Sequence, residues 1–391
     1  MKRYLYLLLV IVGLIGFTNS VFAKEPTLIS FIYLNGSNDY TAVDRLKFED
    51  HFKKQVSKMH PVMVKELEED EFVQQKLLKN GEYKINPEPI VFYWGDRSVK
   101  EVQNIDNGLC RAKEYTPRIA QIVRNVFAHC LHDAIWVQKT QNMTPIVDDL
   151  QKVVMSEKQK GRKVILLGYS AGSFVTYNYF LSKFTSIIPK ELHANTNNPD
   201  ILKIVNDTPV NPTCLDALME LNLVNLDISG KFHTTNNVDL FRENYPKLDE
   251  KTKCCCFASD DVKGVVNFAS PLLLFYSDAT NSKSSLYFLS HLMSKHMIEN
   301  DLFFLTINYK NDPLGFPSSN HSSFEELKNS SPIHPKNYKN GEGFIYNYSD
   351  VYVPRTFISA HLAYWDTPRR FVKAIVKSYN EGYYKFYGIE K

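Results

Sequence analysis

The stretch from Lys163 to Phe174, KVILLGYSAGSF, joins an apolar strand to a helix through a serine, and it is the strongest local indication of the fold. The run 164–167 is continuously apolar, which is typical of a strand covered on both faces. The chain holds only 16 glycines, yet Gly168 and Gly172 flank Ser170. This spacing predicts a tight strand-to-helix turn that lifts the serine clear of the sheet.

Outward from this turn, strand-like and helix-like stretches alternate along the chain, which favours an α/β fold with a mainly parallel sheet. The predicted strands are 27–36, 88–96, 162–170, 262–275, 301–312 and 343–353. The predicted helices are 44–59, 116–137, 144–160, 284–297 and 367–380. The region 183–261 breaks the alternation with Pro, Asn and Asp turns, and it is too long for a simple loop. We therefore interpret it as an insertion.

The N-terminus has the pattern of a secretory signal peptide. Lys2 and Arg3 precede an apolar run, 4–17, and small residues lead up to Ala23. The predicted mature chain begins at Lys24 and is exported to a periplasm or secreted. The alternative is an uncleaved segment, 4–23, that anchors the chain in a membrane.

The composition and net charge limit the classes of function that the chain can have. The 391 residues are 44% hydrophobic and 23% charged, which is ordinary for a globular protein. The formal net charge is +3, and cleavage after residue 23 would remove two positive charges and leave +1. This balance, with no basic stripe, argues against nucleic acid as a partner.

Six cysteines follow the predicted cleavage site, and export would permit disulfides. Cys110 with Cys130 is one plausible pair, and Cys214 could pair with one member of the CCC run, but the connectivity stays open. A zinc site at this run is a weaker interpretation because the usual C-x-x-C spacing is missing. The cysteines are Cys110, Cys130, Cys214, Cys254, Cys255 and Cys256.

The position of Ser170 in this turn indicates a nucleophile. A serine hydroxyl is a poor nucleophile unless a base takes its proton. The helix that follows Ser170 adds free backbone N–H groups and a positive dipole end, where an oxyanion could be stabilised. The alternative is a glycine-rich turn whose serine has only a structural role.

With the motif Gly168-x-Ser170-x-Gly172 in place, the chain resembles the lipase-like and esterase-like serine hydrolases of the α/β-hydrolase superfamily. That family orders its triad as Ser, then Asp or Glu, then His, each after a strand. The resemblance implies Asp312, in the turn NDPLG, as the acid. It implies His361 as the base, on the loop between the last strand and the closing helix. The segment HLAYW around His361 is similar to a His-x-x-Tyr-Trp segment of some of these enzymes.

The resemblance also implies an oxyanion hole. One donor would be the backbone N–H of Ala171, and the other the N–H of Ser37 or its neighbour Gly36. The NGS sequence at 35–37 departs from the His-Gly that the family often shows, so Gly36 and Ser37 both stay candidates for the second donor.

Several rivals stay open for the acid and the base. Asp278 follows the predicted strand 262–275, where some lipases carry the acid, and Asp350 lies inside the predicted strand 343–353. The histidine pair in HCLHDAIW is more typical of a helix face than of a metal site. The rival bases lie in a helix-like pattern or in the loop after Asp312: His291, His296, His321 and His334.

The sequence thus predicts an exported α/β-hydrolase whose core is 24–182 and 262–391, with 183–261 as a cap over the site. The expected reaction is hydrolysis of a carboxylic ester, of a lipid or another apolar acyl group, and contact with a membrane surface would be transient. Neither a cofactor nor a metal is implied. A thioesterase, an amidase, an acyltransferase or a non-catalytic hydrolase-like binding protein are the alternatives, and the oligomeric state stays open.

Overall fold

The protein is described from a computed structural model. It describes residues 25–37, 42–112, 117, 120, 132–185, 224–226, 232–234, 262–276, 297, 301–316, 342–355 and 357–389. The predicted signal peptide lies outside these residues. So does nearly all of the predicted cap, apart from 183–185 and the short antiparallel pair β5 (Val224–Leu226) and β6 (Phe232–Thr234).

The centre of the molecule is a seven-stranded sheet in the order β2-β1-β4-β7-β8-β9, with β3 also paired to β1. Every pairing in it is parallel. The predicted α/β architecture with a mainly parallel sheet is therefore confirmed. The strands are β1 (Thr27–Leu34), β2 (Tyr83–Ile85), β3 (Ile90–Phe92), β4 (Lys163–Tyr169), β7 (Val262–Phe268), β8 (Phe303–Ile307) and β9 (Phe344–Tyr348).

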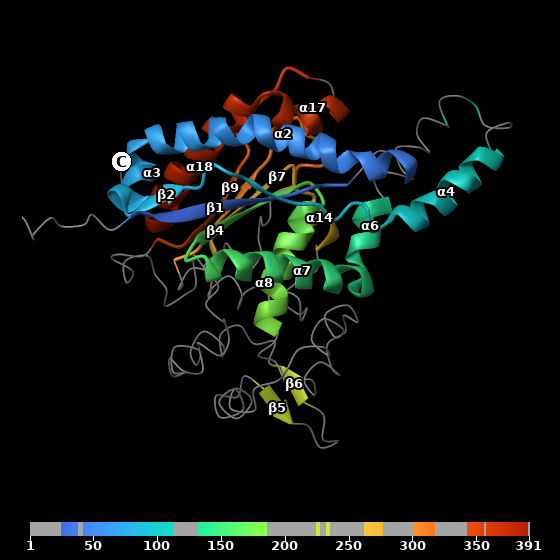
Figure 1. The fold of residues 1–391 in the computed structure, drawn as a ribbon, viewed down its shortest axis with the longest axis horizontal. Helices are drawn as coiled ribbons and strands as arrows, with labels where there is room; N and C mark the ends of the chain where they lie inside the picture. The colour runs from blue at the N-terminus through green and yellow to red at the C-terminus, as the bar shows by residue number, and fades with distance from the viewer. Residues whose placement is uncertain are drawn as a thin grey trace, which may run out of the picture.

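Helices cover both faces of the sheet (Figure 1). On one face lie α2 (Ala42–Glu69), α3 (Glu71–Lys76), α17 (Phe357–Asp366) and α18 (Pro368–Tyr387). On the other face lie α6 (His132–Gln138), α7 (Thr140–Gln159) and α8 (Gly172–Thr185). The remaining described elements are η1 (Lys79–Gly81), α4 (Val99–Ala112) and α14 (Leu272–Phe275).

Strand β4 shows why two layers of helices are needed. Its side chains alternate between two buried clusters: Val164 and Leu166 pack under α7 and α8, whereas Ile165 and Leu167 pack under α2 and α18. Successive strand residues point to opposite faces. A continuously apolar strand therefore buries both faces, as the run 164–167 predicted.

The observed strands are shorter than several predicted ones. The stretch 262–275 is not one strand: β7 ends at Phe268, and 272–275 form the short helix α14. Ala269 has a positive φ of 52°, and Pro271 occupies the position before the helix, so the backbone cannot continue the ladder. The first helix is longer than predicted, because α2 continues through Pro61 to Glu69.

Candidate active site

The site lies at the carboxyl ends of the central strands. After β1 the chain passes through α2 to the β2 and β3 side of the sheet, whereas after β4 it continues toward β7 on the other side. The two connections diverge between β1 and β4, and such a switch point opens a crevice at the carboxyl ends of the strands. The loop 35–37 and Ser170 meet there, at the ends of β1 and β4.

Ser170 is the turn between β4 and α8, and its φ of 49° lies in the left-handed region. A residue with a β-carbon is uncommon there and costs on the order of 1–3 kcal/mol unless its surroundings hold it. The Ser170 N–H donates to the Phe268 carbonyl at 2.9 Å, and the Ser170 carbonyl accepts from the Ser173 N–H at 2.9 Å. These two bonds fix the turn, and the strain sits on the predicted nucleophile.

The glycines around Ser170 let three backbone segments approach closely. A β-carbon on Gly172 would lie 2.7 Å from the Asn35 carbonyl oxygen, and one on Gly168 would lie 2.5 Å from the Asn267 Oδ1 atom. A β-carbon on Gly36 would lie 2.7 Å from the Ser170 β-carbon. Gly36 therefore lies directly against Ser170, and a larger residue at any of the three positions would push the turn apart.

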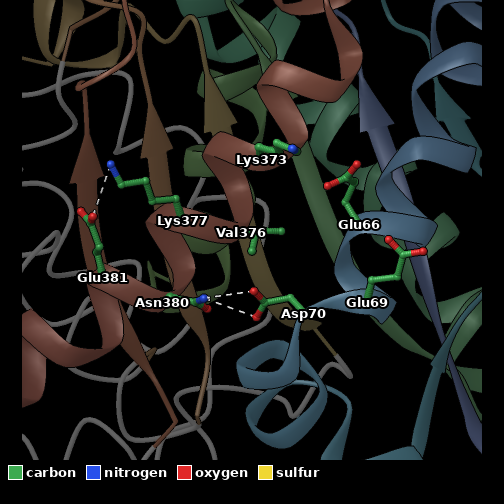
Figure 2. Close-up of a pocket in the computed structure, with 8 residues that line it drawn as sticks. All are labelled: Glu66, Glu69, Asp70, Lys373, Val376, Lys377, Asn380 and Glu381. Carbon is green, nitrogen blue, oxygen red and sulfur yellow. Dashed lines mark hydrogen bonds and ion pairs between the residues drawn. The ribbon is translucent and has the colours of Figure 1, made fainter. Parts of the chain in front are cut away.

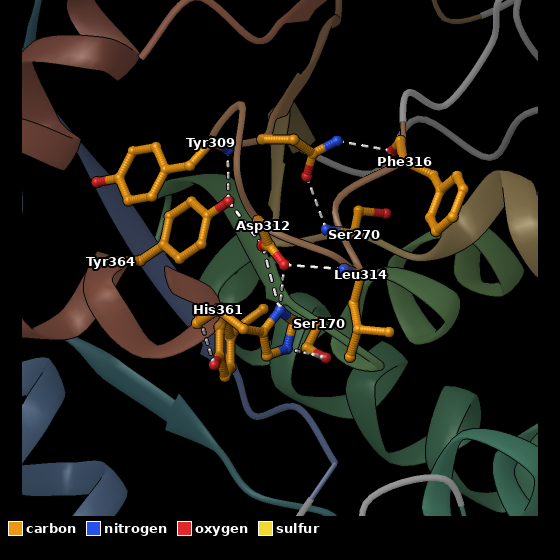
Figure 3. Close-up of polar contacts among 10 residues, drawn as sticks. Ser170, Ser270, Tyr309, Asp312, Leu314, Phe316, His361 and Tyr364 are labelled. Atoms are coloured by element: carbon orange, nitrogen blue, oxygen red, sulfur yellow. Dashed lines mark hydrogen bonds and ion pairs between the residues drawn. The ribbon is translucent and has the colours of Figure 1, made fainter. Parts of the chain in front are cut away.

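His361 hydrogen-bonds both of its predicted partners, as Figure 3 shows. Its Nε2 atom lies 3.0 Å from the Ser170 Oγ atom. Its Nδ1 atom lies 2.9 Å from Oδ1 and 3.1 Å from Oδ2 of Asp312. The structure thus brings together three side chains that the sequence singled out separately.

One detail of the sequence interpretation is wrong. His361 is not on a loop, because it lies inside α17, which ends at Asp366 next to the start of α18. The buried residues of this helix, among them Ala360, Ala363 and Tyr364, pack on the core and leave His361 facing the end of β8. Packing thus makes a helix of residues that the sequence places in a loop.

Asp312 lies in a turn after β8, and only 6% of its surface is exposed. Its carboxylate accepts hydrogen bonds from the Leu314 N–H at 3.0 Å and from the Tyr364 hydroxyl at 2.9 Å. With His361 these make three donors to the carboxylate. A carboxylate can only accept, so His361 Nδ1 carries a proton, and Nε2 is free to accept the Ser170 proton.

The loop that carries Asp312 is itself held at both ends. The Asn308 side chain accepts from the Ser270 N–H at 2.9 Å and donates to the Phe316 carbonyl at 2.7 Å. A β-carbon on Gly315 would lie 2.9 Å from the Asn308 β-carbon, so the loop closes tightly over this side chain. Asp312 is therefore presented from a fixed turn.

The predicted oxyanion donors lie beside Ser170. The backbone N–H groups of Ala171, Gly36 and Ser37 have no hydrogen-bond partner within the described residues. The loop 35–37 is anchored by Trp94, whose backbone N–H donates to Asn35 Oδ1 at 2.9 Å and whose indole N–H donates to the Asn35 carbonyl at 2.8 Å. The loop is thus rigidly placed while its amide groups stay available.

Two tyrosines that the sequence analysis did not single out contact the predicted acid and the predicted base. Tyr364 binds Asp312, and the Tyr169 hydroxyl donates to the His361 carbonyl at 3.0 Å. Tyr364 lies three residues after His361 in α17, a spacing that puts two side chains on one helix face. That spacing, visible in HLAYW, could have indicated Tyr364 once the segment was known to be helical.

The rival residues are not brought to the site where they are described. Asp350 follows β9, is exposed, and its carboxylate lies 3.8 Å from the Lys310 ammonium group. His132 begins α6 and contacts Asp133 at 3.4 Å. The other histidines and the aspartate that the sequence analysis considered lie outside the described residues: Asp278, His129, His291, His296, His321 and His334. Every cysteine except Cys110 also lies outside them. Cys110 is in α4, and its side chain is not described.

A surface groove lies away from this site, between α2 and α18 (Figure 2). Its walls are mostly charged, with Glu66, Glu69 and Asp70 from the α2 side and Lys373 and Lys377 from α18. None of Ser170, His361 or Asp312 lines it. Such a polar groove does not suit an apolar acyl group.

Two features are absent from the residues that the structure describes. Among them, no helix is both long enough and apolar enough to span a bilayer. Nor do three or more His, Cys, Asp or Glu side chains gather there as a metal ion would require.

Comparisons with known proteins add no identification. The chain matches no family model, no curated protein and no solved structure. Any functional conclusion therefore depends on the chemistry of the site.

Proposed function

We propose that this chain is a serine hydrolase of the α/β-hydrolase type that cleaves carboxylic esters through an acyl-enzyme. The observation that carries the proposal is the continuous hydrogen-bonded path from Ser170 Oγ through the imidazole of His361 to the carboxylate of Asp312, with distances of 3.0 and 2.9 Å. The left-handed φ of Ser170 supports it, because backbone strain of this kind clusters at functional sites.

In the proposed reaction, Ser170 Oγ attacks the acyl carbonyl while His361 Nε2 takes its proton. The imidazolium that forms is stabilised by the buried charge of Asp312 and later gives its proton to the leaving alcohol. Water then repeats the cycle on the acyl-enzyme and releases the acid. The first transfer, from Ser170 Oγ to His361 Nε2, uses a contact of 3.0 Å, which already has hydrogen-bond length.

The proposed oxyanion hole combines the N–H of Ala171 with that of Gly36 or Ser37. An oxyanion needs donors that are aimed and unoccupied. These amides lie beside Ser170 and are not used by another described group. The strained turn and the Trp94 anchor would keep them in place during the reaction.

The assignment to the α/β-hydrolase type rests on order and placement. Ser170 follows β4, Asp312 follows β8 and His361 follows β9, which is the chain order Ser, Asp, His of that type. The Ser170 turn between a strand and a helix agrees with its nucleophile elbow. We extend the proposal to an exported chain with 183–261 as a cap. A thioesterase, an amidase or an acyltransferase would use the same groups.

The test is covalent labelling of the purified protein with a fluorophosphonate probe, which reacts with activated serines. We expect the wild-type chain to be labelled, and both Ser170→Ala and His361→Ala to lose labelling. Ser57→Ala and His51→Ala are the controls, because both residues are exposed on α2 and should label as the wild type does. A folded wild-type chain without labelling would leave the non-catalytic binding protein as the better explanation. p-Nitrophenyl esters of increasing acyl length would then define the substrate class.

A further inference from the structure

Tyr364 joins the acid to the backbone of its own loop. Its hydroxyl donates to Asp312 Oδ2 at 2.9 Å and accepts from the backbone N–H of Tyr309 at 2.7 Å. The side chain is fully buried, and its ring stacks on that of Tyr309 with centroids 4.0 Å apart and an interplanar angle of 3° (Figure 3). The hydroxyl therefore has one fixed orientation.

The direction of these bonds follows from the partners. The N–H of Tyr309 can only donate, so the Tyr364 oxygen accepts from it, and the hydroxyl proton is left for the carboxylate. Burial, followed by the charge of Asp312, raises the pKa of Tyr364 well above its ordinary value. The hydroxyl therefore stays protonated, and remains a donor, at every pH at which the protein is folded.

The two oxygens of Asp312 are held by different elements. Oδ1 accepts from Leu314 within the loop, and Oδ2 accepts from Tyr364 in α17. A carboxylate fixed at both oxygens cannot rotate, so the face that it presents to His361 Nδ1 is set. Because α17 also carries His361, the same helix positions both the base and the acid that orients it.

We propose that Tyr364 is a positioning residue of the hydrolytic site. It holds the Asp312 carboxylate in the plane that His361 needs and disperses part of its negative charge. The inference rests on the proposed function, since it assigns a role within that site. Tyr364 is fully buried and hydrogen-bonds Asp312, not Ser170, so it acts through Asp312.

Removal of the hydroxyl should have two effects. In Tyr364→Phe the carboxylate gains freedom to rotate, and we expect the limiting rate of fluorophosphonate labelling to fall about tenfold. A change of that size corresponds to the free energy of one hydrogen bond to a charged group. The undispersed charge of Asp312 would also stabilise the imidazolium of His361 more strongly. The acid limb of the labelling-rate profile should therefore move to higher pH.

The matched control is Tyr309→Phe, which removes the hydroxyl of the stacked partner ring. That hydroxyl hydrogen-bonds neither Asp312 nor His361, so the labelling rate and its pH profile should stay as in the wild type.

A double variant separates positioning from general support of the fold. In an Asp312→Asn background, adding Tyr364→Phe should change the labelling rate by less than about twofold, because the group through which it acts is gone.

The outcomes divide cleanly. If the folded wild-type chain is not labelled, the proposed function fails and this inference fails with it. If the wild type is labelled and Tyr364→Phe keeps its rate and profile, the role of Tyr364 alone is overturned. An equal loss in both Asp312 backgrounds would also overturn it, because the residue would then support only the fold.

If Tyr364→Phe does not fold, 3-fluorotyrosine at position 364 replaces it, because it keeps the ring and makes the hydroxyl a stronger donor. The acid limb should then move to lower pH, and an unmoved limb would contradict the inference.

Discussion

Two buried histidines in this molecule use both ring nitrogens, yet their surroundings differ in kind. His361 lies between the carboxylate of Asp312 and the hydroxyl of Ser170. His60 in α2 lies between the Tyr33 hydroxyl, 3.0 Å from its Nδ1, and the Asn86 carbonyl, 2.8 Å from its Nε2. Both are largely shielded from water, with 8% and 1% of their surfaces exposed.

The difference lies in the charge of the partners. A carboxylate stabilises an imidazolium, whereas the neutral partners of His60 do not. Burial lowers the pKa of His60 against the smaller opposing effect of the Asn86 carbonyl. Tyr33, itself buried, has a raised pKa and stays neutral. Hydrogen bonds at both nitrogens are therefore not enough to make a histidine a base. The proposed base, His361, differs from His60 in having an anion on one side and the hydroxyl of a serine with a strained backbone on the other.

Giving His361 neutral partners, as His60 has, should reduce activity most. Asp312→Asn replaces the anionic partner by a neutral amide, which would favour the wrong tautomer of the imidazole and leave its charged form unstabilised. We expect kcat/KM for a p-nitrophenyl ester to fall about 10⁴-fold, with the melting temperature measured alongside.

Asp350→Asn is its matched control, because that carboxylate is exposed and faces Lys310. It should leave kcat/KM within about twofold, as is usual for surface substitutions. Equal losses in both variants, or none in Asp312→Asn, would contradict the assignment of Asp312.

The next effect tests the nucleophile side of the comparison. In Gly36→Ala the new β-carbon would lie 2.7 Å from the Ser170 β-carbon and 3.0 Å from the Tyr169 carbonyl oxygen. The turn or the loop must shift, and displacement of a reacting atom by about 1 Å can cost on the order of 10²-fold in rate. We expect a loss of that size in the fluorophosphonate labelling rate.

Gly108→Ala in α4 is the control, since a β-carbon there meets no atom within 4 Å. It should leave labelling unchanged and stabilise the helix by about 0.5–1 kcal/mol, measured by denaturant unfolding. Wild-type labelling in Gly36→Ala would show that the close approach of the loop to Ser170 does not matter.

The smallest effect concerns stability at His60. Because the pKa of His60 is lower in the folded chain than in the unfolded one, the unfolded chain binds more protons below about pH 6.5. Its contribution to stability is complete above that pH and is lost as the pH falls. The free energy of unfolding of the wild type should fall more steeply between about pH 6.5 and 5 than that of His60→Gln, by at most about 1.4 kcal/mol per pH unit. Parallel pH profiles from denaturant titrations would contradict this.

Much of the architecture could be predicted from local pattern. The apolar runs that predict β1, β4, β8 and β9 have no competing interpretation, so their existence is clear even where their ends are not. The failures have local causes of a different kind. The strand predicted over 262–275 stops at a backbone kink at Ala269, and α17 is a helix because its buried residues pack on the core. Sequence periodicity records neither effect.

The Ser170 turn could be predicted from local sequence alone, because its requirements are steric and lie within a few residues: two glycines, an apolar strand before and a helix after. The sequence also supplies Asp312 and His361 as candidates. That these side chains meet depends on how distant segments pack, since His361 is 191 residues from Ser170 and 49 from Asp312 in the chain. The same is true of His60, whose partners Tyr33 and Asn86 lie 27 and 26 residues away in the chain. A side chain carries its chemistry in the sequence, but the charge of its neighbours is set by which strands and helices pack side by side.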